Sequence, residues 1–81
     1  MISSMQIRAA RGLVGISQLE LAEFAGVGVA TIRRIEVARE QVSGNAQTLV
    51  RIQRALESKG VEFIDQDDKK GPGVRLKKPL R

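Results

Sequence analysis

Only three residues, Gly26 to Gly28, separate two short helical patterns within the stretch from Ile16 to Glu36. A connection this short prevents the two helices from lying antiparallel along each other, and they are instead expected to meet at a steep angle. One helix is then held on the back of the other with one face turned outward. The side chains on that outward face therefore decide what this region can contact.

The first of these two helices has clear start and stop signals. Ser17 is followed three residues later by Glu20, a spacing at which the hydroxyl and the carboxylate each accept a backbone N–H at a helix start. Gly26 suits the left-handed conformation that ends many helices. The apolar residues of the side to be buried are Leu21, Ala22 and Ala25.

The second helix is predicted over about residues 29–37 and has two contrasting sides. At 100° per residue, Ile32 and Ile35 share one face with Gly28. The opposite face carries Ala30, Arg33, Arg34 and Val37. The inward side is therefore apolar, and the outward side is small and then basic.

Two more helices are expected to flank this pair. Apolar residues at helical spacing predict a first helix over residues 2–13 and a last helix over residues 46–58. The candidate caps at their starts are Ser3 or Ser4 for the first, and Ser43 or Asn45 for the last.

The end of the chain changes to strand periodicity. "VEFID" and "VRLKK" alternate apolar and polar residues, and the turn-rich "QDDKKGPG" separates them. The pattern predicts either a hairpin or two separate edge strands, and such a unit needs a partner surface because two strands alone are marginal in water. We therefore divide the chain into a helical domain over residues 1–60 and a strand segment with a basic tail over residues 61–81.

The composition narrows the classes of function. The 81 residues include no Cys and no His, which excludes disulfides, most metal sites and His-based catalysis. The few carboxylates are not arranged as an acid and a base, so we expect no enzymatic activity, no metal and no cofactor. No apolar run is long enough to span a membrane and no signal-peptide core is visible, so we expect a cytoplasmic protein.

The net charge of +5 is unevenly distributed along the chain. Residues 1–44 carry +1, residues 45–68 carry −2 and residues 69–81 carry +6. A basic tail suits either a solvated chain end or an arm that adds affinity for nucleic-acid phosphates, and both interpretations stay open.

Between residues 11 and 56 a set of residues stands in a characteristic order and spacing: Arg11, "GISQ" at 15–18, "LA" at 21–22, "GV" at 26–27, "TI" at 31–32, Glu36, "TL" at 48–49 and "AL" at 55–56. In these residues the chain resembles the phage-repressor and Cro-like helix-turn-helix family, also called the xenobiotic-response-element type. The resemblance implies a mainly α fold, a compact helix-turn-helix bundle of four to five short helices. To this we add the C-terminal β-hairpin or dimerisation strands.

In this family the second helix of the motif enters the DNA major groove, and dimers read two half-sites. Val29 and Ala30 keep the leading edge of that helix small and suit contact with thymine methyl groups. Arg34, one turn further on, has the reach and the forked geometry to hold guanine O6 and N7. We therefore expect Val29, Ala30 and Arg34 to read bases.

Phosphate contacts are expected on either side of these reading residues. Thr31 and Arg33 flank Arg34 and suit phosphates, which position the helix without specifying a sequence. The resemblance implies a phosphate contact for Gln18, at a helix start where backbone N–H groups favour an anion. It further implies DNA-backbone contacts for Arg39, Ser43 and Asn45.

Two further features follow from the resemblance. Arg11 and Glu36 match the family's ion pair, which joins the first helix to the end of the third. The chain departs from the family at Gly28, Val29 and Ala30, where members often have Ser or Thr followed by hydrogen-bonding side chains. Few hydrogen bonds to bases remain, so sequence specificity is expected to rely on Arg34, methyl contacts and DNA shape.

These observations predict a sequence-specific regulator of transcription that binds double-stranded DNA. We expect a nucleoid-associated repressor or autoregulator, a homodimer on a palindromic operator, without a small-molecule ligand or a membrane partner. The residues expected to form the dimer are Val61, Phe63, Ile64, Val74 and Leu76. The alternative is a protein-binding module on the same scaffold, an antitoxin or an anti-activator, whose partner is a toxin or another regulator.

Leu19 and Phe24 are expected either at the surface or beneath the C-terminal strands.

Overall fold

Helices form the first three quarters of the chain and two strands follow them. The structure, a computed structural model, describes residues 2–38 and 45–80. Within these segments the elements are α1 (Ser4–Val14), α2 (Gln18–Ala25), α3 (Val29–Val37), α4 (Ala46–Ser58), β1 (Val61–Ile64) and β2 (Gly73–Leu76). The mainly α fold with a C-terminal hairpin is thus confirmed.

The helix ends follow the local signals closely. Ser17 and Glu20 form the expected capping box at α2, and Gly26 ends that helix in the left-handed conformation with φ of 70°. Ser3, rather than Ser4, caps α1, which therefore begins two residues later than predicted. Asn45 caps α4 through a bond from the Thr48 N–H to its side-chain oxygen, while Ser43 lies outside the described residues.

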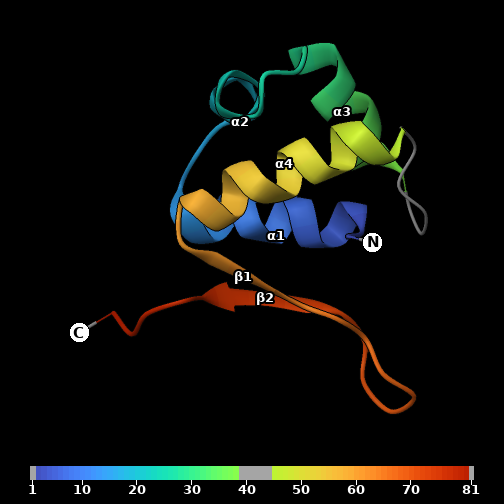
Figure 1. Cartoon of the computed structure of the whole chain (residues 1–81), viewed down its shortest axis with the longest axis vertical. Helices are drawn as coiled ribbons and strands as arrows, with labels where there is room; N and C mark the ends of the chain where they lie inside the picture. Colours follow the sequence, from blue (N-terminus) through green and yellow to red (C-terminus); the bar gives the residue numbers. More distant parts are fainter. Residues whose placement is uncertain (1, 39–44, 81) are drawn as a thin grey trace.

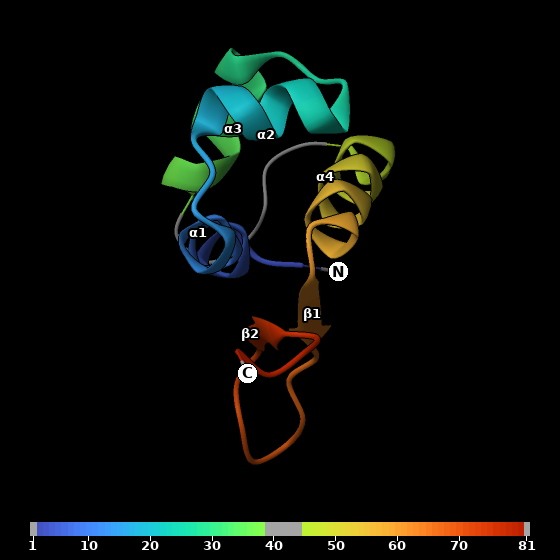
Figure 2. The same cartoon turned by 90° about the vertical axis from the view of Figure 1, so that its left-hand side faces the viewer.

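The helices meet around one core. Helices α1 and α4 run alongside each other, α2 and α3 lie over one side of this pair, and the hairpin lies along the opposite side (Figure 1 and Figure 2). Figure 1 shows α2 nearly end-on and α3 from the side, so the two helices cross steeply as their short connection requires. The largest fully buried apolar side chains are Ile7, Leu21, Ile32, Ile35, Ile52, Leu56 and Val61.

The two strands pair with each other within the chain. They are antiparallel, with Val61 opposite Leu76 and Ile64 opposite Gly73. Phe63 and Val74 pack against the core from the hairpin, so the helices provide the partner surface that an isolated pair of strands lacks. No helix of the described segments has the length and apolar character needed to cross a membrane.

The two apolar residues of uncertain placement on α2 lie at the surface. Leu19 is 58% exposed and Phe24 is 47% exposed. The ammonium group of Lys59, at the end of α4, lies 3.7 Å from the centroid of the Phe24 ring. Phe24 therefore gains a cation–π contact with α4 while much of its ring remains in water.

Candidate nucleic-acid interface

The two faces of α3 differ in burial as its sequence predicts. Ile32 and Ile35 are 0% and 1% exposed and hold the helix against the core. The opposite face carries the exposed residues Ala30, Arg33, Arg34 and Val37. This helix lies at the end of the molecule remote from the hairpin (Figure 1). Both arginines are thus free to reach a ligand several ångströms from the protein surface.

The start of α3 offers fewer contacts than its middle. Gly28 is the N-cap residue and provides no side-chain hydrogen bond to the helix. Ala30 is exposed, but Val29 is half-buried and packs against the core, and Thr31 is also half-buried. Of the two small residues predicted to read bases, Ala30 is therefore the more accessible.

A buried carboxylate connects this helix to α1. Glu36 is 4% exposed, and its Oε2 accepts a hydrogen bond from Arg11 Nε at 2.7 Å. Arg11 Nη2 donates to Glu36 Oε1 at 2.9 Å, so the ion pair is bidentate. Arg11 Nη1 also donates to the carbonyl of Ile16 at 3.0 Å. The same guanidinium therefore fixes both the end of α3 and the chain that enters α2.

Gln18 joins the same network from the first turn of α2. Its Nε2 donates to Glu36 Oε1 at 3.0 Å. One N–H of the amide is thereby committed to the protein, and the orientation of the side chain is fixed. Gln18, predicted to bind a phosphate, is thus half-buried and held by Glu36 at the N-terminus of α2.

The network sets the charge of its members. Burial acts to raise the pKa of Glu36, but hydrogen bonds from Arg11 and Gln18, with the charges of Arg11 and Arg8, outweigh it and hold this pKa below its usual value. The hydrogen bond to Glu36 raises the pKa of Arg11, against the effect of partial burial. Both groups are therefore charged at neutral pH, as a stable ion pair requires.

Three polar residues of α1 have roles that the sequence did not reveal. Ser4 Oγ donates to the carbonyl of Ala38 at 2.5 Å, and Arg8 donates to the carbonyl of Glu36. Gln6 is 5% exposed, and its Nε2 donates to the carbonyls of Ile64 at 3.2 Å and Gly73 at 2.9 Å.

A local signal existed for only part of this. Gln6 follows Ser3 at capping-box spacing, and its Oε1 does accept the Ser3 N–H. Its bonds to the hairpin, by contrast, join residues about sixty positions apart and leave no local pattern.

The remaining predicted site residues are those for DNA-backbone contacts near the start of α4 and those for dimerisation. Arg39 and Ser43 are outside the described residues, and Asn45 is exposed but uses its side-chain oxygen as the cap of α4. Among the residues predicted for dimerisation, Ile64 is 38% exposed and Leu76 is half-buried. Val61 is 0% exposed and belongs to the core of its own chain, and the dimer contact expected of these residues stays a prediction.

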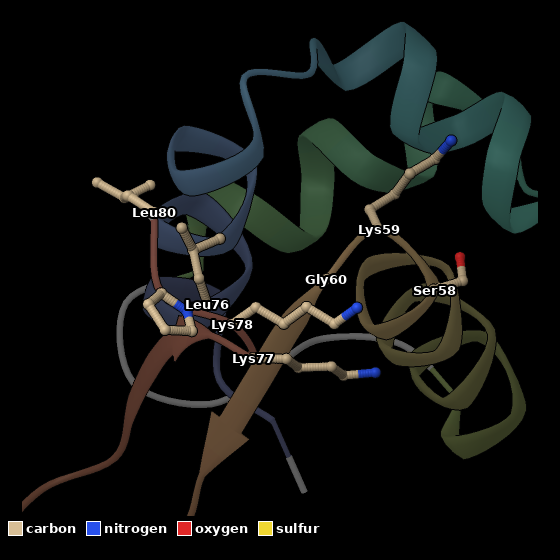
Figure 3. A pocket seen from close by; sticks show the side chains of 8 residues that line it. Ser58, Lys59, Gly60, Leu76, Lys77, Lys78 and Leu80 are labelled. Atoms are coloured by element: carbon tan, nitrogen blue, oxygen red, sulfur yellow. The ribbon is translucent and has the colours of Figure 1, made fainter.

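A second basic region, besides the one on α3, lies at the C-terminal end of α4. A hollow of about 430 Å³ is lined by Lys59, Lys77 and Lys78 together with Ser58, Gly60, Leu76, Pro79 and Leu80 (Figure 3). Lys77 Nζ donates to the carbonyl of Glu57 at 2.8 Å, where the negative end of the helix dipole favours a cation. In Figure 3 the Lys59 side chain turns away from the hollow toward α2. Two of these three lysines are therefore engaged within the chain.

Comparison with known proteins agrees with this geometry. The model of the helix-turn-helix family of the Cro/C1 type matches residues 7–63, more than two thirds of the chain. A search of curated proteins finds no match. The family match confirms the resemblance carried by Arg11, Gln18, Glu36 and their neighbours. The chain belongs to the Cro/C1-type helix-turn-helix family of DNA-binding transcription regulators.

Proposed function

We propose that this protein is a sequence-specific regulator of transcription, a repressor or autoregulator, that places α3 in the major groove of a palindromic operator. The observation that supports this proposal is the asymmetry of α3, which buries Ile32 and Ile35 and exposes Arg33 and Arg34. A major groove about 12 Å wide admits one helix, provided that the leading side of the helix carries no packed side chains.

The exposed residues divide into two roles. Arg34 has the donors to hold guanine O6 and N7 together, and Ala30 leaves room for a thymine methyl group. Arg33 and Thr31 bind phosphates on either side, and Gln18 adds a phosphate contact from the start of α2. Asn45 extends the phosphate contacts to the start of α4. Arg39 and Ser43, in the segment between α3 and α4, are proposed for the same role.

We further propose that the protein acts as a homodimer through residues 61–81. In the described chain each strand pairs with one neighbour only, so each has an outer edge with unpaired backbone groups that a second copy can pair with. Ile64 is the most exposed apolar residue of the strands and is expected at this contact. Two subunits would place the α3 helices about 34 Å apart, so the operator is palindromic.

The test is to measure binding of the purified protein to labelled DNA from upstream of its own gene. Fluorescence anisotropy of that DNA monitors the binding, and unlabelled duplexes serve as competitors. Specific binding predicts at least a hundredfold preference over a scrambled duplex of equal length. Arg34→Ala is expected to lose most of that preference. Arg33→Ala is expected to weaken binding to all duplexes alike and to lower the salt slope, the dependence of log binding constant on log salt concentration, by about 1 in magnitude.

Lys69→Ala is the matched control, because it removes one positive charge from the hairpin turn, at the other end of the molecule from α3 (Figure 1). It should leave both the preference and the salt slope almost unchanged. Sedimentation of the wild type and of Ile64→Gln tests the dimer, and equal monomer fractions in the two would argue against the strand contact. Equal affinity for all duplexes in low salt, lost in moderate salt, would contradict sequence-specific recognition.

Exposed apolar side chains away from α3 favour one other function, that of a protein-binding module such as an antitoxin or anti-activator. Met5 on α1 is 51% exposed and Leu19 on α2 is 58% exposed. A regulatory effect that survives Arg34→Ala but is lost in Leu19→Gln would support this alternative.

A further inference from the structure

Val37 is the last residue of α3 and is unusually accessible for an apolar side chain. It is 78% exposed, more than Met5, Leu13, Leu19 or Phe24. It lies one helical turn beyond Arg33 and Arg34 on the same outward face. An isolated exposed valine is ordinary on a protein surface, so its exposure alone indicates no function.

The backbone on both sides of Val37 is anchored, which is less ordinary. The carbonyl of Glu36 accepts a hydrogen bond from Arg8, and the carbonyl of Ala38 accepts one from the fully buried Ser4. Ala38 is already extended, with φ of −63° and ψ of 141°, so the helix stops directly after Val37. Two side chains of α1 thus hold this end of α3 in one position while the valine points into solvent.

Resting on the proposed DNA-binding function, we propose that Val37 is a specificity-determining residue that contacts the C5-methyl group of one thymine. It extends the reading face of α3 beyond Ala30 and Arg34. Ala30 and Val37 are separated by about 10 Å along the helix, which corresponds to about three base-pair steps. Along α3 the reading face then presents, in order, the small Ala30, the cation of Arg34 and the apolar Val37.

The chemistry of the groove selects the thymine. Val37 has no hydrogen-bond donor or acceptor, so it distinguishes base pairs only through apolar contact. The thymine methyl is the apolar group that the four bases present in the major groove. Because the anchored backbone has little freedom left to lose on binding, an apolar contact at this position costs less ordering entropy than one from a mobile loop.

The experiment is a double-mutant cycle between Val37→Ala and single thymine-to-deoxyuridine replacements. Its probe is the tightest duplex recovered from a random library with the wild-type protein. Deoxyuridine keeps every hydrogen-bonding group of thymine and removes only the methyl. One replacement is expected to weaken DNA binding by the wild type about fourfold, which is the value of one buried methyl group. The same replacement is expected to leave the affinity of Val37→Ala unchanged.

Val50→Ala provides the matched control, because Val50 is an exposed valine on α4, outside α3. It should show the wild-type loss at the same thymine. Thermal unfolding of the two variants should differ little, since both valines are exposed. If the wild type selects a duplex but every thymine replacement weakens wild type and Val37→Ala equally, this inference is overturned while the proposed function stands. If no duplex is selected at all, the proposed function itself fails.

Discussion

Arg11 and Glu36 lie 25 residues apart in the chain and are joined by two hydrogen bonds, of 2.7 Å from Nε and 2.9 Å from Nη2. Gln18 donates to the same carboxylate. One buried acid therefore connects α1, α2 and α3, the three helices whose relative angles decide how α3 is presented. The stability of the fold and the geometry of the reading face depend on the same group.

Glu36→Gln is expected to lower the free energy of unfolding by about 2–3 kcal/mol, because it leaves the Arg11 guanidinium without a buried counter-charge. Urea unfolding followed by circular dichroism measures this loss. Glu62→Gln is the control, since it breaks the exposed pair with Arg75, and a clearly smaller loss is expected there because water screens exposed charges. Equal losses in the two variants would mean that the buried pair gives no special support.

The stability is expected to fall in acid, and Glu36 should contribute to the fall. Because the pKa of Glu36 is lower in the folded protein than in the unfolded chain, its contribution is complete above the unfolded value of about 4.3 and is lost as pH falls through the folded value. Urea midpoints measured from pH 7 to pH 3 should therefore decrease more steeply in the wild type than in Glu36→Gln. Parallel curves would exclude Glu36 as a source of the dependence.

Two glycine substitutions are expected to change the free energy of unfolding in opposite directions. Gly26 ends α2 with φ of 70°, so Gly26→Ala forces a side chain into the left-handed region and should cost about 1 kcal/mol. Gly12 lies inside α1 with no atom within 4 Å of an added Cβ, so Gly12→Ala should stabilise by up to about 1 kcal/mol. Thermal unfolding of both variants gives the comparison, and a Gly26→Ala variant as stable as the wild type would contradict the role of the helix end.

Removal of the Gln6 amide is expected to loosen the hairpin. Gln6→Leu leaves the carbonyls of Ile64 and Gly73 without their donor, at a cost of about 1–3 kcal/mol. Hydrogen exchange should then accelerate in β1 and β2 more than in α2 or α3. Gln47→Leu, at an exposed position on α4, is the control and should leave the exchange pattern unchanged. Uniform acceleration along the chain would indicate global destabilisation rather than release of the hairpin.

The helix boundaries and the exposed face of α3 were predictable because their causes are local. Ser17 with Glu20, Gly26, and the spacing of Ile32 and Ile35 each act within one or two helical turns. The order of these signals along the chain also carried the family resemblance, which the family match confirmed. The strands were predictable as elements, but not whether they pair within the chain or between two copies.

Long-range hydrogen bonds were decided only when the elements packed together. Gln6 bridges both strands, Ser4 and Arg8 hold the end of α3, and Gln18 turns its amide to Glu36, all through partners distant in sequence. A buried polar group must find a partner wherever packing places one, and no short pattern records which partner that is. The sequence by itself therefore determined the helices and which side of α3 faces outward. Only the tertiary structure decided what holds that side in place, because contacts between distant segments depend on how the whole chain packs.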